Sequence, residues 1–435
     1  MTTPQIIIFG FAGLILLGSL LLMLPVSARS GSGASFTDAL FTATSAVCVT
    51  GLVVHDTASF WSLPGQIIIL GLIQTGGMGV VTLALAIYTL SGKRIGLKQR
   101  TAMQEAISAP NIGGIIRLSR FVIKMILIIE MLGTILLATI FCRDFGLMKG
   151  LWYALFHSVS AFCNAGFDLM GLRAPYSSLT GYAGHPVINL TISSLIIIGG
   201  IGFMTWDDVR KYGIHIRRYH MQSKVVLVTS FFLISLPMVY FYYYECQALP
   251  GKERVWAAFF QSVTARTAGF NTVDLSSFGD TGLMVLMALM LVGGSPGSTA
   301  GGMKTTTLAV MIATMVTVFF RKDQTHLFRR RIPEEAVRNA LAIFMLYLIL
   351  FLTGALLICH LDGIPLVASL FETASALGTV GLTTGITEGL SLYSRFILIV
   401  LMYTGRVGGL TLIFSAVSSK KAGFSRLPEE KITVG

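Results

Sequence analysis

The sequence predicts an all-α integral membrane protein with eight transmembrane helices and four short re-entrant pore helices, arranged as four repeats around a pseudo-tetrameric pore. Three observations predict this fold: the composition, the spacing of the apolar stretches and a fourfold internal repeat. Of the 435 residues, 54% are hydrophobic and only 12% are charged, and the mean hydropathy is +0.77. Soluble domains carry about 25% charged residues. The composition therefore excludes a soluble enzyme and a nucleic-acid-binding domain.

The apolar stretches are each about 20 residues long, which is enough to cross the ~30 Å hydrocarbon core of a bilayer. They lie near Ile6–Leu24, Gly65–Leu90, Phe121–Phe141, Ile188–Trp206, Val225–Tyr244, Leu283–Phe320, Leu341–Cys359 and Phe396–Val417. The sixth is too long for one plain helix, and Gly293–Gly302 interrupts it. The first precedes Val26-Ser27-Ala28, so a cleaved signal peptide is the alternative there. Its length and the absence of an earlier Lys or Arg favour a membrane helix.

Basic residues gather in alternate connections between these stretches. Of the 32 Lys and Arg residues, 21 lie in the segments Lys93–Arg120, Arg210–Lys224, Arg321–Arg338 and Lys420–Lys431. Connections rich in Lys and Arg stay on the cytoplasmic side of a membrane. We therefore expect a multi-pass protein with both termini in the cytoplasm. The net charge of +12 indicates topology and not a nucleic-acid partner.

A similar segment follows the first span of each pair. Its four copies are LFTATSAVCVTGL (40–52), LFHSVSAFCNAGF (155–167), FFQSVTARTAGF (259–270) and LFETASALGTVGL (370–382). The span after each copy contains a glycine motif, namely GGMG (76–79), GGIG (199–202), GGSPG (293–297) and GRVGG (405–409). These matches predict four repeats at 1–92, 93–216, 217–332 and 333–420, followed by a C-terminal tail at 421–435.

Each copy reads as a short helix that ends in an extended glycine-containing stretch. A helix of about 11 residues cannot cross the bilayer, so at membrane depth it must enter and return on the same side. Irregular backbone at that depth must be buried in protein or line a water-filled cavity. Four such stretches around one axis would form rings of carbonyl oxygens that replace the hydration shell of K⁺. The repeat therefore predicts ion conduction, with ordinary outer loops as the alternative.

These residues resemble the Trk/Ktr/HKT superfamily of K⁺ transporters over essentially the whole chain. The most specific segments are Arg266–Phe270, Ala376–Leu382 and Gly405–Gly408. The eight-span length is similar to the membrane subunits of Ktr systems, KtrB and KtrD. The resemblance implies channel-like K⁺ uptake across the bacterial plasma membrane, with Na⁺ as an activator and no covalent cofactor. It also implies a homodimer with one pore in each subunit.

The resemblance assigns the selectivity filter to four short stretches, whose backbone carbonyls would coordinate K⁺. They comprise Val47, Cys48, Val49, Thr50, Gly51, Cys163, Asn164, Ala165, Gly166, Arg266, Thr267, Ala268, Gly269, Gly378, Thr379, Val380 and Gly381. In this superfamily, serine at the first filter glycine accompanies Na⁺ preference, so Gly51 supports K⁺. Because the four stretches differ, we expect weaker selectivity for K⁺ over Na⁺ than in a symmetric channel.

The resemblance also implies an intramembrane loop that gates the pore beneath the filter. The expected gating residues are Gly293, Gly294, Ser295, Pro296, Gly297, Ser298, Thr299, Ala300, Gly301, Gly302, Lys304 and Arg406. A simple kink is the alternative for the glycine-rich break. A phosphate-binding loop is disfavoured because Met303 separates the glycine from Lys304. Arg406 would act as an electrostatic barrier below the filter, with a buried structural ion pair as the alternative.

Several other polar residues have structural interpretations. Arg266 needs a partner beside a cation pathway, and Glu372 or Asp38 could supply one. Lys124 and Glu130 are interpreted as packing or interhelix contacts, since residues six apart do not share a helix face. His157 is expected to be packed within the second pore helix and not to bind a metal.

The sequence has no nucleotide-binding G-x-G-x-x-G unit, so any regulation by nucleotide must come from another chain. Ktr membrane subunits pair with cytosolic RCK subunits of the KtrA/KtrC type, which bind ATP or ADP. The basic segments are candidate docking surfaces, and their alternative role is to set topology and to contact the lipid bilayer. The second candidate function is a secondary cation cotransporter with alternating access. The shared orientation of all four repeats favours a channel-like path, since such cotransporters use inverted repeats.

Overall fold

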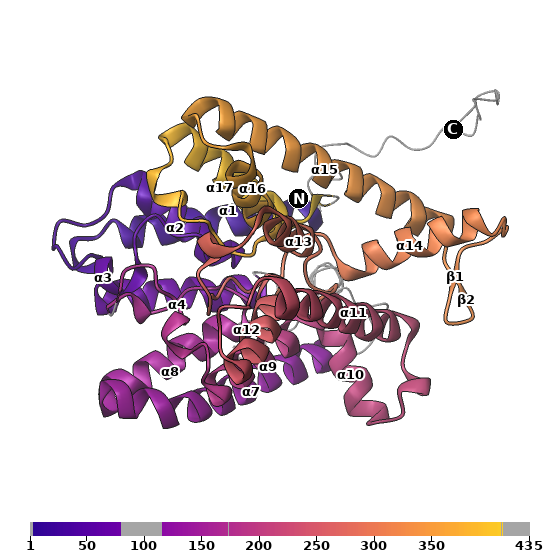
Figure 1. The fold of residues 1–435 in the computed structure, drawn as a ribbon, viewed down its shortest axis with the longest axis horizontal. Helices are drawn as coiled ribbons and strands as arrows, with labels where there is room; N and C mark the ends of the chain where they lie inside the picture. Colours follow the sequence, from indigo (N-terminus) through magenta and orange to yellow (C-terminus); the bar gives the residue numbers. More distant parts are fainter. Residues whose placement is uncertain (1–2, 80–114, 173, 410, 412–435) are drawn as a thin grey trace.

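The computed structural model describes residues 3–79, 115–172, 174–409 and 411, and these residues form helices joined by irregular loops (Figure 1). Four helices among them are long and apolar enough to span a membrane. They are α1 (Thr3–Leu22), α7 (Ile115–Phe145), α11 (Met221–Tyr244) and α15 (Glu334–Asp362). The one sheet in the described part is a hairpin of β1 (His326–Leu327) and β2 (Arg330–Arg331). The prediction of an all-α fold is therefore confirmed.

Each long helix packs closely against a short helix that follows it in the chain. The short helices are α2 (Phe36–Cys48), α8 (Leu147–Phe162), α12 (Gly251–Thr264) and α16 (Leu366–Gly378). Their C-terminal halves are buried, whereas the outer faces of the long helices expose many large apolar side chains. In α7, for example, Leu132, Ile135 and Leu136 are at least half exposed. Continuous apolar surface of this kind is typical of contact with a membrane.

A third set of helices follows the short ones and breaks at the glycine motifs. It comprises α4 (Leu63–Met78), α9 (Pro186–Gly200), α13 (Asp280–Leu291), α14 (Thr305–Phe319) and α17 (Leu392–Val407). The predicted span Ile188–Trp206 is not one continuous helix, because α10 (Phe203–Tyr212) leaves α9 at 96°. Gly202 lies at this bend with a φ of 89° that favours glycine. The expected interruption at Gly293–Gly302 is confirmed, since it separates α13 from α14.

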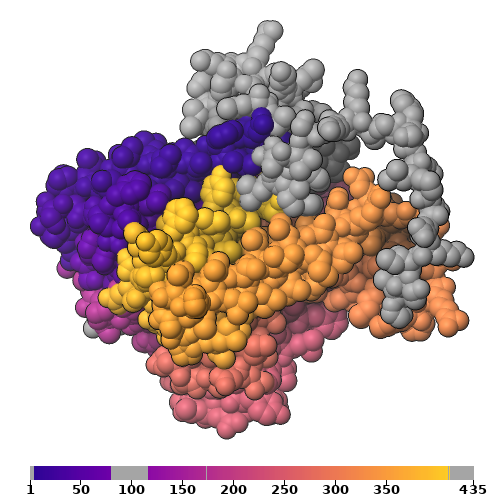
Figure 2. All heavy atoms as spheres, turned by 90° about the horizontal axis from the view of Figure 1, so that it is seen from above, coloured from indigo at the N-terminus to yellow at the C-terminus, as the bar shows by residue number. Residues whose placement is uncertain are grey.

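We refer to each long helix, the short helix that follows it and the next third-set helix or helices as one unit. The four units close on one another through the third-set helices. The short helix of each unit packs against the third-set helix of a neighbouring unit: α8 against α4, α12 against α9, α16 against α13, and α2 against α17. The first and last units therefore meet, and the short helices lie at the centre of the molecule. In Figure 1, α12, α13 and α16 lie between α7 on one side and α15 on the other. Figure 2 shows the outward face of α15 as an orange band beside yellow α17.

Small 3₁₀ segments and one short helix complete the loops on the side where the short helices begin. They are Pro25–Ser27, α3 (Thr57–Phe60), Met170–Leu172, Thr180–Tyr182, Leu275–Ser277 and Thr387–Gly389. A further 3₁₀ segment, Ile216–Arg218, lies between α10 and α11 at the opposite end of α11. The predicted basic segment Lys93–Arg120 lies largely outside the described residues. The ends of the predicted spans at Leu90 and Val417, the basic segment Lys420–Lys431 and the tail 421–435 also lie outside them.

Candidate ion pathway

A buried turn follows each short helix at the centre of the fold. In each turn, one residue other than glycine has a left-handed backbone, with φ of 59° at Val49, 58° at Asn164, 84° at Thr267 and 52° at Thr379. Residues other than glycine adopt this conformation rarely, because it is strained. The turns coincide with the four predicted filter stretches. Their backbones leave the helix here and are free to direct carbonyl groups elsewhere.

A hydroxyl group on each short helix holds the turn that follows it. Ser45 and Ser375 accept hydrogen bonds from the N–H groups of Gly51 and Gly381, both at 3.0 Å. In the other two units the hydroxyls donate to carbonyls, from Ser160 to Phe167 and from Thr264 to Phe270, both at 2.7 Å. Sequence reasoning did not name these four residues as part of the site. The signal was present, since a Ser or Thr before Ala recurs in all four copies.

The glycines at the ends of the four turns form a closed ring. A Cβ atom built on Gly51 would lie 2.5 Å from the carbonyl oxygen of Ala165 and 3.1 Å from Cα of Gly166. The same relationship leads from Gly166 to Gly269, from Gly269 to Gly381 and from Gly381 back to Gly51, with Cα atoms 2.9–3.2 Å from the built Cβ. Each glycine also has a φ between 70° and 91°. Glycine is therefore required here by both conformation and space.

The ring brings four backbone carbonyl groups together. The carbonyl oxygens of Thr50, Ala165, Ala268 and Val380 lie 2.1–2.6 Å from the Cβ positions built on the neighbouring glycines. All four residues are fully buried. The short helices end at this ring, and the C-terminal end of a helix carries partial negative charge. An arrangement of this kind can coordinate a dehydrated monovalent cation through oxygen atoms of neutral groups.

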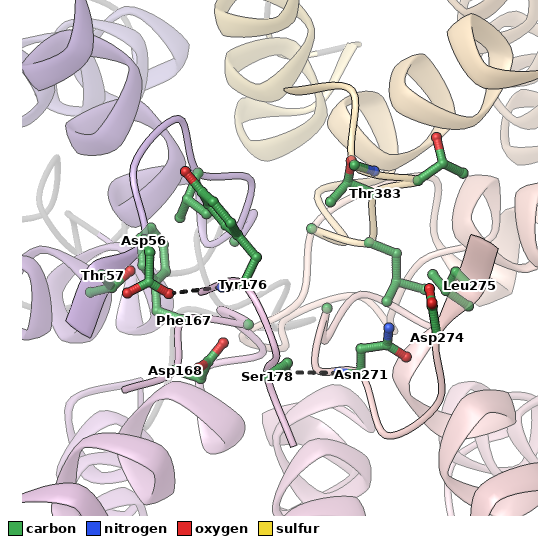
Figure 3. Close-up of a pocket in the computed structure, with 18 of the residues that line it drawn as sticks. Asp56, Thr57, Phe167, Asp168, Tyr176, Ser178, Asn271, Asp274, Leu275 and Thr383 are labelled. Carbon is green, nitrogen blue, oxygen red and sulfur yellow. Dashed lines mark hydrogen bonds between the residues drawn. The ribbon is translucent and has the colours of Figure 1, made fainter. Parts of the chain in front are cut away.

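A cavity opens above the glycine ring (Figure 3). It has a volume of about 200 Å³, and all four ring glycines and three aspartates, Asp56, Asp168 and Asp274, are among its lining residues. Asp56 accepts hydrogen bonds from the N–H groups of Ser59 and Tyr176 at 2.8 and 3.2 Å. Burial raises the pKa of Asp168 to about 7, although a hydrogen bond from the Met170 N–H opposes the shift. Sequence reasoning missed these acids, each within five residues of a filter glycine.

The glycine-rich segment between α13 and α14 lies on the other side of the ring. The two ends of this loop lie side by side, since the Gly293 N–H donates to the Met303 carbonyl at 2.8 Å. A Cβ built on Gly301 would lie 2.3 Å from Oγ1 of Thr379, so the loop packs directly against the fourth filter turn. The loop residues Ser295 and Thr299 also donate backbone hydrogen bonds to Gly200 and Gly199 of α9, at 3.0 and 3.2 Å.

Arg406 ties this loop to two other units. Its guanidinium donates to the backbone carbonyls of Thr299 in the loop and of Gly76 and Gly77 in α4, the last at 3.1 Å. Within the described residues it has no carboxylate partner at salt-bridge distance. Lys304 donates to the Ala300 carbonyl at 2.7 Å and so braces the same loop. The predicted gating residues are therefore brought together.

The predicted partners of Arg266 are wrong. Its guanidinium donates to the Ser230 hydroxyl of α11 at 3.2 Å, and its Nε has no partner within the described residues. Asp38 instead pairs with Arg395 at 3.0 Å, and Glu372 accepts from the Thr387 hydroxyl at 3.0 Å. Both carboxylates thus bind residues of their own surroundings and not Arg266, although Oε2 of Glu372 has no hydrogen-bond partner within the described residues.

Two further interpretations agree with the geometry. His157 is fully buried, with Nδ1 2.7 Å from the Tyr153 carbonyl, and the Leu169 N–H donates to its Nε2 at 3.3 Å. Its ring packs against those of Phe141 and Phe270, which fits a packed residue. Glu130 makes an interhelix contact to Gln74 of α4, as expected.

Comparison with known proteins identifies the family of this chain. The family model described as TrkH, cation transport protein, matches residues 2–426 of the chain. The chain belongs to the TrkH family. Relatives include the potassium/sodium uptake protein NtpJ of Enterococcus hirae, 38% identical over 99% of this chain and 97% of the relative. The Ktr system potassium uptake protein B of Bacillus subtilis is 37% identical over 100% of this chain and 97% of the relative.

A solved structure shares the fold. The potassium transporter TrkH from Vibrio parahaemolyticus superposes with a TM-score of 0.74, covering 95% of this chain and 84% of that structure, at 20% sequence identity. The resemblance inferred from the filter and glycine motifs is thus confirmed at the level of the family. These TrkH-family relatives are transport proteins, and the apolar helices of this chain agree with a multi-pass membrane protein.

Proposed function

We propose that this TrkH-family chain is the ion-conducting subunit of a K⁺ uptake system, with a continuous path from the acidic cavity through the glycine ring to the intramembrane loop. The closed ring of Gly51, Gly166, Gly269 and Gly381 carries the proposal, because it gathers four carbonyls where four units meet. The printed functions of the relatives, potassium and potassium/sodium uptake, support K⁺ as the transported ion. The presence of glycine at position 51 supports preference for K⁺ over Na⁺.

In this proposal the short helices α2, α8, α12 and α16 are the re-entrant pore helices of four repeats with the predicted boundaries. The breaks in the third-set helices and the length of the chain support eight crossings. Both termini lie in the cytoplasm, as the distribution of Lys and Arg predicts. Closure of four similarly oriented units around one ring favours a channel-like path over alternating access.

The loop between α13 and α14 is the gate, and Arg406 holds it closed. The loop packs against Thr379 of the filter, and Arg406 binds it to α4 of the first unit. A gate held by hydrogen bonds from three units can be opened by any force that separates them. We propose that a homodimer and cytosolic RCK subunits of the KtrA/KtrC type, responding to ATP or ADP, supply that force. Na⁺ is an activator in this scheme, with no covalent cofactor.

Complementation tests the proposed function. The chain is expressed in bacteria that lack K⁺ uptake and grown at low external K⁺, with and without an RCK subunit. Growth should be restored and should be strongest with the partner. Gly381→Ala should abolish it, whereas Gly389→Ala, at an exposed glycine with open space around it, should not. Failure of the wild-type chain in both settings, despite its presence in the membrane, would contradict the proposal.

A further inference from the structure

A buried carboxylate lies behind the second filter turn and has no part in the pathway described above. Glu130 is in the middle of α7, a helix long and apolar enough to span the membrane, and only 4% of its surface is exposed. An ionisable side chain at membrane depth is costly and usually serves the function of the protein. Its surroundings therefore indicate what it does.

Three side chains from three elements meet at this position. Glu130 Oε2 accepts a hydrogen bond from Gln74 Nε2 of α4 at 3.2 Å. The Cys163 thiol lies 3.7 Å from Gln74 Oε1 and 4.0 Å from Glu130 Oε1. We refer to Gln74, Glu130 and Cys163 as the Glu130 cluster. It links the first unit, the long helix of the second unit and the second filter turn.

Cys163 has little freedom to move away from this cluster. A Cβ atom on Gly77 would lie 2.6 Å from its sulfur, so the side chain already fills the space against α4. The next residue, Asn164, has the left-handed φ of 58° that begins the turn, and its Nδ2 donates to Thr267 of the third filter turn at 3.0 Å. A shift of Cys163 would thus move the backbone that supplies carbonyls to the ring.

The backbone of Glu130 strengthens the same attachment. Its carbonyl accepts hydrogen bonds from the hydroxyl of Ser158 in α8 at 2.6 Å and from Thr134 in α7 at 2.8 Å. One residue of α7 therefore holds both the second short helix and, through its side chain, the turn that follows. The matching filter positions in the other units are Cys48, Arg266 and Gly378, and of these only Cys48 also carries a thiol.

We propose that Glu130 is a positioning residue that sets ion selectivity by holding the second filter turn through Gln74 and Cys163. The inference rests on the proposed K⁺ filter. A site that distinguishes ions by the placement of its oxygens needs support that keeps those oxygens in register. The shape and the hydrogen-bonding capacity of the side chain at position 130 are what matter. Glu130→Gln should therefore preserve ion selectivity, and Glu130→Leu should not.

The test compares Glu130→Gln and Glu130→Leu as purified full-length protein in liposomes, measuring the ratio of K⁺ to Na⁺ flux. Glu130→Leu should lower the ratio by about fivefold, which corresponds to roughly 1 kcal/mol of lost discrimination. Glu130→Gln should keep the ratio within about twofold of wild type, less than roughly 0.5 kcal/mol. Thr139→Val is the matched control, because it removes an exposed hydroxyl of α7 that donates to the Leu136 carbonyl at 2.7 Å and does not contact the Glu130 cluster, and it should leave the ratio unchanged.

A purely structural role predicts a different result. Folded Glu130→Leu protein with a lower melting temperature and the wild-type flux ratio would overturn the proposal, as would an equal loss of selectivity in both variants at position 130. Gln74→Leu provides a second route if Glu130→Leu does not fold: it should lower the ratio in the same way, and an unchanged ratio would overturn the positioning role. A wild-type protein that does not prefer K⁺ would instead contradict the proposed function.

Discussion

Arg406 of α17 donates a hydrogen bond to the backbone carbonyl of Thr299, 107 residues earlier in the chain. The same guanidinium reaches Gly76 and Gly77 of α4, so one side chain joins the first, third and fourth units. These partners are carbonyls, and within the described residues no carboxylate pairs with the positive charge of Arg406. In the proposed function this charge lies beneath the filter, where the loop acts as the gate.

Replacement of Arg406 by alanine should therefore raise K⁺ flux in the absence of any regulatory subunit. Hydrogen bonds to a charged group are worth about 1.5–3 kcal/mol, so the open state should gain roughly tenfold or more in population. Flux into liposomes measures this gain, and Arg117→Ala, at an exposed arginine of α7, is the control. Unchanged flux with reduced thermal stability would assign Arg406 to structure alone.

Replacement of Gly381 by alanine should abolish transport without unfolding the protein. The added methyl group would lie 2.2 Å from the Thr50 carbonyl oxygen, at a φ of 91° that alanine avoids. The strain is about 1–3 kcal/mol, and it falls on the filter carbonyls. We expect a fall in K⁺ flux of at least about tenfold, as roughly 1.4 kcal/mol would produce. K⁺ flux at the wild-type rate in this variant would show that the ring is not part of the ion pathway.

Transport should depend on pH through Asp168. Burial raises the pKa of this carboxyl to about 7 in the folded protein, so it ionises as the pH rises through 7. The cavity above the filter then gains negative charge and concentrates cations. The apparent KM for K⁺ should thus fall as the pH rises from 6 to 8, by about fivefold for roughly 1 kcal/mol of added attraction.

Asp168→Asn isolates this effect. Asparagine keeps the shape of the side chain but cannot ionise, so the KM should stay at its low-pH value across the range. Initial rates of K⁺ uptake at several pH values provide the measurement. A variant that retains the full pH dependence would show that another group causes it.

The ion pair between Asp38 and Arg395 should stabilise the closure of the first unit onto the fourth. Its atoms lie 3.0 Å apart, and both side chains are about four-fifths buried. Arg395→Ala should lower the free energy of unfolding by roughly 1–3 kcal/mol, since it leaves a carboxylate partly unsatisfied. Thermal unfolding in detergent measures the loss, with Arg338→Ala as an exposed control. If the losses of stability in Arg395→Ala and in Asp38→Asn add up to the loss in the double variant, the two side chains are not energetically coupled.

The sequence predicted the parts of the site that depend on local backbone conformation. Gly51 and Gly381 were identifiable because a left-handed turn after a short helix favours glycine, and the break at Gly293 because a flexible polar segment cannot continue an apolar helix. The family resemblance extended this reasoning to Asn164 and Thr267, whose residue types alone carry little signal.

The parts that depend on tertiary contacts were not predictable in the same way. Arg266 was assigned a carboxylate, yet its partner is Ser230, a common residue with no pattern that marks it. The partners of Arg406 are backbone carbonyls, which every sequence contains. The sharp bend after Gly200 also depends on packing, because the residues of α10 could equally have extended α9.

The most direct test of the central claim measures K⁺ and Na⁺ flux through the purified full-length chain in liposomes, in an Arg406→Ala background that should hold the gate open. The account predicts selective K⁺ flux that Gly381→Ala removes and Gly389→Ala preserves. Equal flux of the two ions, or K⁺ flux that survives Gly381→Ala, would contradict the claim that the glycine ring is the K⁺ filter.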